Sequence, residues 1–216
     1  MKKLGFIMKI TALAAITAMT VAGCQPLQSP GGSQANKSSY EKIQKKLVEL
    51  QTYKSDATVE YKSNKGSNTY ETVQQCKING EYRIEVTAPA NVAGSVTVND
   101  GKSIRQFNQA LQSQVQVSTG ENQERSELFV TSFIKNYLSS DEVSVSVANF
   151  GEGNCTVLEA GIPGGHPYMA KEKLWIDNKT LDPVQLVVYD TQDIERIIVT
   201  YKTFEYNITL DDSVFQ

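Results

Sequence analysis

Apolar and polar residues recur along this chain with two different periods. From Ser38 to Leu50 the period is helical, and Ser38 followed by Glu41 has the spacing of a capping box, so a helix is predicted to begin at Ser38. Its apolar positions are Tyr40, Ile43, Leu47 and Leu50. A second apolar stripe predicts a helix over residues 126–138.

The remaining segments alternate with a period of two, which is typical of half-buried strands. Strands are predicted over 57–62, 82–87, 143–147, 171–176, 184–189 and 194–204. Turns rich in Asn, Asp and Gly separate several of them, as between antiparallel strands. The pattern predicts an α+β, mostly β domain over residues 40–216. Its curved antiparallel sheet would wrap around about two helices that cover one face.

The N-terminus carries an export signal. Three lysines precede the uncharged segment Ile10–Ala22, which is shorter than a membrane span of about 20 residues and typical of a secretory signal. The segment ends in Val21-Ala22-Gly23-Cys24, which resembles the lipobox of bacterial lipoproteins. We therefore expect a signal peptide over 1–23, a lipid on Cys24, and a flexible tether over 24–39. The protein would be exported and anchored to a membrane by this lipid.

Composition, charge and the missing motifs exclude several classes of function. The chain has 216 residues, 40% of them hydrophobic and 21% charged, as in ordinary globular proteins. Its net charge of −3 argues against a nucleic-acid partner. The one histidine, His166, lies in a turn-rich loop, so no nucleophilic triad or zinc site is predicted. No phosphate-binding glycine loop is present either. We predict no catalytic residue, no metal and no cofactor, and hence no enzyme.

Two cysteines remain besides Cys24. Cys76 and Cys155 lie in strand-like segments of an exported protein, where a disulfide can persist. Such a bond would close a loop of about 80 residues and contribute on the order of 4 kcal/mol. The alternative, which we favour, is two buried thiols that do not meet.

Several short motifs follow one another in the order seen in the LolA/LolB-like superfamily. They are Tyr82-Arg83-Ile84-Glu85, Ala88-Pro89, Asp100-Gly101-Lys102, Leu174-Trp175-Ile176-Asp177, Asp182-Pro183, Tyr206-Asn207 and Phe215. The resemblance covers roughly residues 40–216 and implies an incomplete antiparallel barrel around helices. Among lipidated members, the chain looks most like the GerS-like germination lipoproteins of spore-forming anaerobes.

That resemblance implies a noncatalytic protein that binds and activates a cortex-modifying N-acetylmuramoyl-L-alanine amidase (CwlD-like), for muramic-δ-lactam formation and spore germination. It also implies a location on the cell membrane or on the outer face of the forespore. The alternative is a lipid or lipoprotein carrier with an apolar cavity between sheet and helices. Carriers have Arg-Pro where this chain has Lys77-Ile78, and an aromatic residue where it has Arg105. These departures argue against lipid carriage. A homo-oligomer stays open.

The lipid anchor gives the first testable prediction. Cys24→Ser should abolish lipidation, because only a thiol accepts the diacylglyceryl group, and should leave the folded domain intact. Membrane fractionation should lose the protein, and its thermal unfolding transition should stay unchanged. A variant that still partitions fully with membranes would show that Cys24 is not the anchor.

Overall fold

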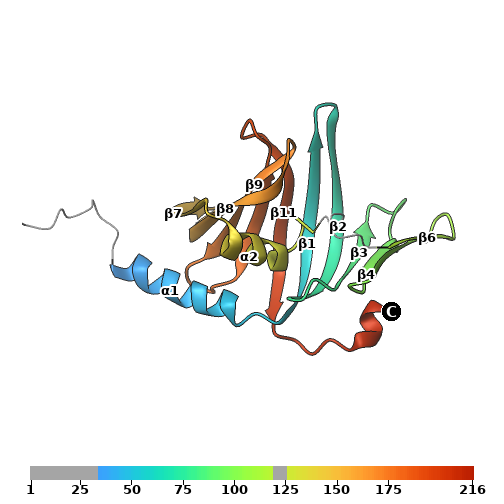
Figure 1. Cartoon of the computed structure of the whole chain (residues 1–216), viewed down its shortest axis with the longest axis horizontal. Coiled ribbons are helices and arrows are strands. Elements are labelled where there is room, and N and C mark those ends of the chain that lie inside the picture. The colour runs from blue at the N-terminus through green and yellow to red at the C-terminus, as the bar shows by residue number, and fades with distance from the viewer. Residues whose placement is uncertain (1–33, 119–125) are drawn as a thin grey trace, which may run out of the picture. The chain divides into compact units, whose positions relative to one another are not determined.

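One antiparallel sheet organises the part of the chain that the structure describes. The computed structural model describes residues 34–118 and 126–216. Their eleven strands follow one another in the order β6-β5-β4-β3-β2-β1-β11-β10-β9-β8-β7, and every neighbouring pair is antiparallel (Figure 1). The strands are β1 Thr52–Ser63, β2 Gly66–Lys77, β3 Tyr82–Ala88, β4 Val96–Asn99, β5 Ser103–Asn108, β6 Ser113–Ser118, β7 Val143–Phe150, β8 Gly153–His166, β9 Met169–Asp177, β10 Pro183–Tyr189 and β11 Glu195–Tyr206.

The helices are few and short. They are α1 Gln34–Val48, α2 Val130–Ser139 and the 3-10 helix η1 Asp212–Phe215. The predicted fold class is therefore confirmed: a mostly β protein with one antiparallel sheet and two α-helices. No helix of the described residues is long and apolar enough to span a membrane.

Both predicted helix starts were wrong. Helix α1 begins at Gln34, so Ser38 lies inside it and is not its N-cap. Helix α2 begins at Val130 after an extended Phe129, four residues later than predicted. In each case the apolar stripe located the helical turns that pack on the sheet. Such a stripe says little about the ends of a helix, which depend on local backbone geometry.

The core lies between the helices and one face of the sheet. Strand β1 shows the pattern most plainly, because alternate residues from Tyr53 to Val59 are buried. Helix α1 contributes Ile43 and Leu47 to the same cluster, and α2 contributes Phe133 among others. Both helices contact β8, and α2 also contacts β9. Figure 1 shows α2 crossing in front of this part of the sheet. We call this covered side of the sheet the inner face.

Strand β7 departs from the expected burial. The alternating valines at 143–147 form a strand as predicted, but β7 is the last strand of the sheet. Val143, Val145 and Val147 pair with inner-face positions of β8, yet each stays 44–46% exposed. The helices do not reach this edge far enough to cover it.

Substitution of Leu47 tests the packing of α1. Leu47 is 6% exposed, so Leu47→Asp would bury an unpaired carboxylate and should lower the free energy of unfolding by several kcal/mol. The adjacent Val48 is 67% exposed, and Val48→Asp should change stability by no more than about 0.5 kcal/mol. Chemical denaturation of both variants measures this difference. Equal stabilities would mean that α1 is not docked.

Candidate functional site

The inner face of the sheet is covered over only part of its width. Helices α1 and α2 pack near β8 and β9, whereas β3 to β6 lie beyond them (Figure 1). Val115 and Val117 of β6 point to the inner face and are 59% and 49% exposed. The uncovered part of the inner face holds a groove, which we treat as the candidate site.

This groove, which we call the concave groove, has a volume of about 450 Å³. Aromatic and aliphatic side chains line it together with amides and hydroxyls, and none of its lining residues is charged. They are Val59, Tyr61, Asn68, Tyr70, Thr72, Tyr82, Ile84, Val86, Val92, Ser95, Thr97, Gln106, Asn108, Leu128 and Phe129. Five neighbouring strands, β1 to β5, supply most of them, because alternate residues of each strand point to the same face.

Two aromatic pairs shape the concave groove. Tyr61 of β1 and Tyr70 of β2 meet edge to face, with ring centroids 6.0 Å apart. Tyr82 packs on Phe129 at 4.5 Å, and this pair belongs to the hydrophobic core. The groove therefore has a buried aromatic base at one side and a more accessible tyrosine pair at the other.

A second groove, of about 420 Å³, adjoins the first through Tyr61 and Leu128. We call it the His166 groove. Its Arg196 is fully engaged: Nε donates to Asp190 Oδ2 at 2.7 Å, and the guanidinium lies 5.1 Å from the ring centroid of Tyr168. This arginine holds the β10–β11 turn and is not free to bind a ligand.

His166 has no catalytic partner in this groove. Its Nδ1 accepts the backbone N–H of Tyr168 at 3.3 Å, and no hydroxyl or thiol of the described residues hydrogen-bonds to the imidazole. Within residues 34–118 and 126–216, no three His, Cys, Asp or Glu side chains gather as metal ligands. We therefore treat the two grooves as candidate binding surfaces.

The cysteines fall into two groups. Cys24 lies outside the described residues. Cys76 on β2 and Cys155 on β8 are both buried and free, so the disulfide considered from the sequence is not formed. Four strands separate β2 from β8 in the sheet, which explains why the thiols do not meet. Burial raises the pKa of both thiols and so disfavours reactive thiolates.

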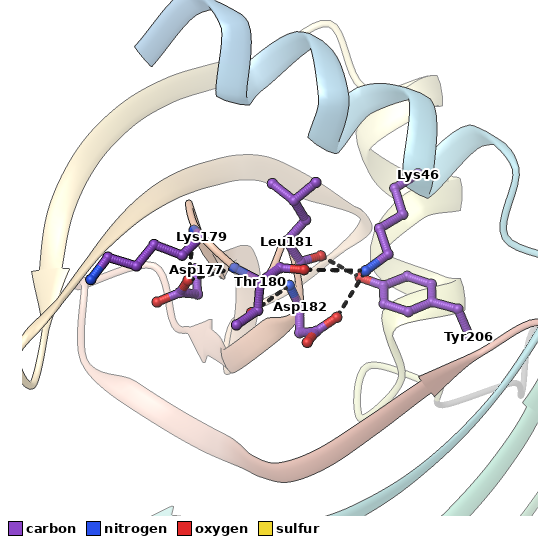
Figure 2. A network of polar contacts seen from close by, with 7 residues as sticks. All are labelled: Lys46, Asp177, Lys179, Thr180, Leu181, Asp182 and Tyr206. Carbon is purple, nitrogen blue, oxygen red and sulfur yellow. Dashed lines mark hydrogen bonds and ion pairs between the residues drawn. The ribbon is translucent and has the colours of Figure 1, made fainter. Parts of the chain in front are cut away.

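Several of the sequence motifs meet at the end of α1, away from the grooves. Lys46 lies 2.9 Å from Asp182 Oδ1, and its ammonium sits 3.8 Å from the ring centroid of Tyr206. The Tyr206 hydroxyl donates to the carbonyl of Leu181 at 2.8 Å. Asp177 closes the same turn by accepting two backbone N–H bonds through Oδ1, at 2.7 and 2.9 Å. Figure 2 shows how this network, the Lys46 clamp, fastens α1 to the β9–β10 turn.

Other motif residues also have structural roles. Asn207 adopts a positive φ of 52° and accepts the backbone N–H of Gln51 at 2.7 Å, which ties the end of β11 to the start of β1. Arg105, which replaces the carriers' aromatic residue, donates to the backbone carbonyl of Phe215 at 2.7 Å. It thereby holds η1 against the outer face of the sheet.

Sequence reasoning missed one buried acid. Glu172 on β9 is fully buried beneath α2, where Oε1 accepts the amide of Asn136 at 2.8 Å and Oε2 has no partner among the described residues. Burial raises the pKa of Glu172 to about 8. The only sequence signal was its place among alternating residues, at a position where Leu174 and Ile176 continue the buried row.

Glu172 makes stability depend on pH. Below a pH of about 4.5 the carboxyl is neutral in both states; as the pH rises towards 8 it ionises only in the unfolded chain, so the free energy of unfolding falls. Glu172→Gln should remove this decrease in the free energy of unfolding. At pH 8 the variant should be more stable than the parent by a few kcal/mol, which is about the free energy that corresponds to the pKa shift of Glu172. Thermal denaturation from pH 5 to 9 measures the effect. The exposed Glu152, as Glu152→Gln, is the matched control; identical pH profiles for both variants would contradict the assignment.

Comparison with known proteins agrees with this architecture. The family model of sporulation protein YdcC-like matches residues 8–215. The GerS lipoprotein, solved in complex with the CwlD amidase from Clostridioides difficile, is 30% identical over 84% of this chain and 100% of that chain, with a TM-score of 0.47. The resemblance to GerS-like lipoproteins expected from the sequence is thereby confirmed. No match was found among curated proteins.

Two more distant solved structures are also similar to this chain. An uncharacterised conserved protein from Thermus thermophilus is 12% identical, with a TM-score of 0.51 over 84% of this chain and 93% of that chain. The LolA superfamily protein NE2245 from Nitrosomonas europaea is 13% identical, with a TM-score of 0.44 over 83% of this chain and 96% of that chain.

Proposed function

Because the chain belongs to the YdcC-like family of sporulation proteins, we propose that it acts in spore formation as a GerS-like, noncatalytic lipoprotein. Its partner would be a CwlD-like N-acetylmuramoyl-L-alanine amidase, which it would bind and activate. The product of that amidase would feed the formation of muramic-δ-lactam in the spore cortex, and hence germination.

One observation carries the proposal. The chain aligns with all of GerS at 30% identity, and GerS was solved as a complex with the CwlD amidase. Identity at that level over a whole domain points to a shared ancestor with the same framework. A binding surface for the same class of partner is the simplest function that such a framework retains.

The side chains support a noncatalytic role. Hydrolysis of an amide needs an activated water or nucleophile, together with a group that takes up its proton. The one histidine is bonded to backbone and has no nucleophile beside it, and the buried thiols have raised pKa values. The chemistry would therefore belong to the partner, and this chain would position or stabilise it.

The anchor fits the same role. A lipid on Cys24 followed by a short tether would hold the domain close to the membrane surface. Restricting both proteins to that layer raises their effective concentration, so an interface of modest affinity would suffice. In this arrangement the lipid supplies location, and the folded domain supplies recognition.

Lipid or lipoprotein carriage remains the second candidate, because the concave groove is large and lined in part by apolar side chains. Native mass spectrometry after mild extraction separates the two functions. A carrier should retain a lipid of defined mass, whereas an amidase partner should be released without one.

Co-expression of the full chain with the CwlD-like amidase tests the proposal. Affinity purification should recover both proteins together, and the purified pair should release peptide from cortex muropeptides faster than the amidase alone. Absence of a complex, together with unchanged amidase activity, would refute the function.

A further inference from the structure

The concave groove contains hydrogen-bonding groups that the folded chain leaves unused. At one end, Asn68 of β2 stands beside Tyr61 of β1 as a cross-strand pair; at the other, Gln106 of β5 stands beside Thr97 of β4. Within the described residues, the two amides and the threonine hydroxyl make no hydrogen bond, although all line the groove. The groove therefore presents amide donors and acceptors at both ends, and the rings of Tyr61 and Tyr70 lie at the Asn68 end.

These groups disfavour an acyl chain as the ligand. Covering an amide or hydroxyl with hydrocarbon removes its bonds to water and replaces them with none, which costs roughly 1–3 kcal/mol for each group. Asn68 and Gln106 would both bear this cost. A ligand with its own hydroxyl and amide groups would instead satisfy them.

The absence of charged side chains from the lining of the concave groove restricts the class of ligand further. No lysine, arginine, aspartate or glutamate lines the concave groove, so it offers nothing to balance a phosphate or a free carboxylate. Tyr61 and Tyr70 offer partly accessible ring surfaces, which suit a flat apolar face. An uncharged ligand that combines apolar faces with polar edges meets both conditions, and sugar rings have this character.

The size also fits a short chain of sugars. The groove spans β1 to β5, which is four strand intervals or about 19 Å across the sheet. Its volume of about 450 Å³ lies within the range of roughly 300–1,000 Å³ typical of small-ligand sites.

We propose that the concave groove binds a cell-wall glycan, a chain of N-acetylated hexosamines, with Tyr61 and Tyr70 against its sugar faces and Asn68 and Gln106 bonded to its acetamido and hydroxyl groups. The inference rests on the proposed function, since an amidase partner acts on peptides attached to such a glycan. The chain would then hold the glycan strand while the partner removes the attached peptide from it.

The test uses the full chain with Cys24→Ser and titrates it with chitohexaose, a soluble oligomer of N-acetylglucosamine, by isothermal calorimetry. Saturable binding is expected. In the variant Asn68→Ala/Gln106→Ala, binding should be lost at the concentration that half-saturates the parent. Both side chains are unbonded, so thermal stability should stay the same. Tyr61→Ala should weaken binding at least tenfold.

Phe107→Ala is the matched control. Phe107 is 39% exposed and Tyr61 is 38% exposed, but Phe107 pairs with an outer-face position and lines a different groove. Chitohexaose should bind this variant as it binds the parent. Equal losses in Phe107→Ala and Tyr61→Ala would overturn the assignment of the groove.

A second titration, with phosphatidylglycerol vesicles, separates a glycan from a lipid. If the groove takes up acyl chains, the variant Asn68→Ala/Gln106→Ala should take up as much lipid as the parent or more. A parent protein that takes up lipid and does not bind chitohexaose would overturn the proposal. Amidase pull-down of the same variants keeps the two hypotheses apart. A complex that forms without any chitohexaose binding refutes the glycan site alone, and glycan binding without a complex refutes the proposed function alone.

Discussion

The extent of helix available to cover an eleven-stranded sheet constrains the whole structure. Ten strand intervals span about 48 Å across the sheet, whereas helices of 15 and 10 residues are about 22 Å and 15 Å long. Two such helices can bury the inner face of only some strands. The core therefore gathers at β8 to β11 and β1, and the remaining inner face stays open as a groove. Core and candidate site are two parts of one continuous surface.

The Lys46 clamp holds α1 in place on the sheet. Lys46, Asp182 and Tyr206 fasten this helix to the β9–β10 turn by an ion pair and a cation–π contact (Figure 2). Partly exposed ion pairs contribute little stability by themselves, about 1 kcal/mol or less. Their effect here is geometric, because they fix the position of the helix along the sheet.

Sequence patterns predicted the fold class, the existence of the C-terminal strands and the docked stripe of α1, since each follows from local alternation. The same patterns missed what depends on neighbours distant in the chain. Val143 to Val147 have the alternation of a half-buried strand, and only the sheet order shows that they lie at an uncovered edge. Asn68 and Gln106 are 38 positions apart and have no motif, so their shared groove could not be inferred before β2 and β5 were placed. Glu172 was missed for the same reason, because only the packing of α2 buries it.

The buried carboxyl of Glu172 couples folding to the solvent in a further way. At neutral pH it stays protonated in the folded domain and is ionised in the unfolded chain, so the domain takes up close to one hydrogen ion from the buffer as it folds. The heat of unfolding measured by calorimetry then includes the heat of protonating the buffer. The measured heat of unfolding should therefore differ between phosphate and Tris at the same pH, although the contacts within the folded chain are identical. Because Glu172 is buried beneath α2, the measured heat of unfolding of this domain depends on the buffer as well as on the protein.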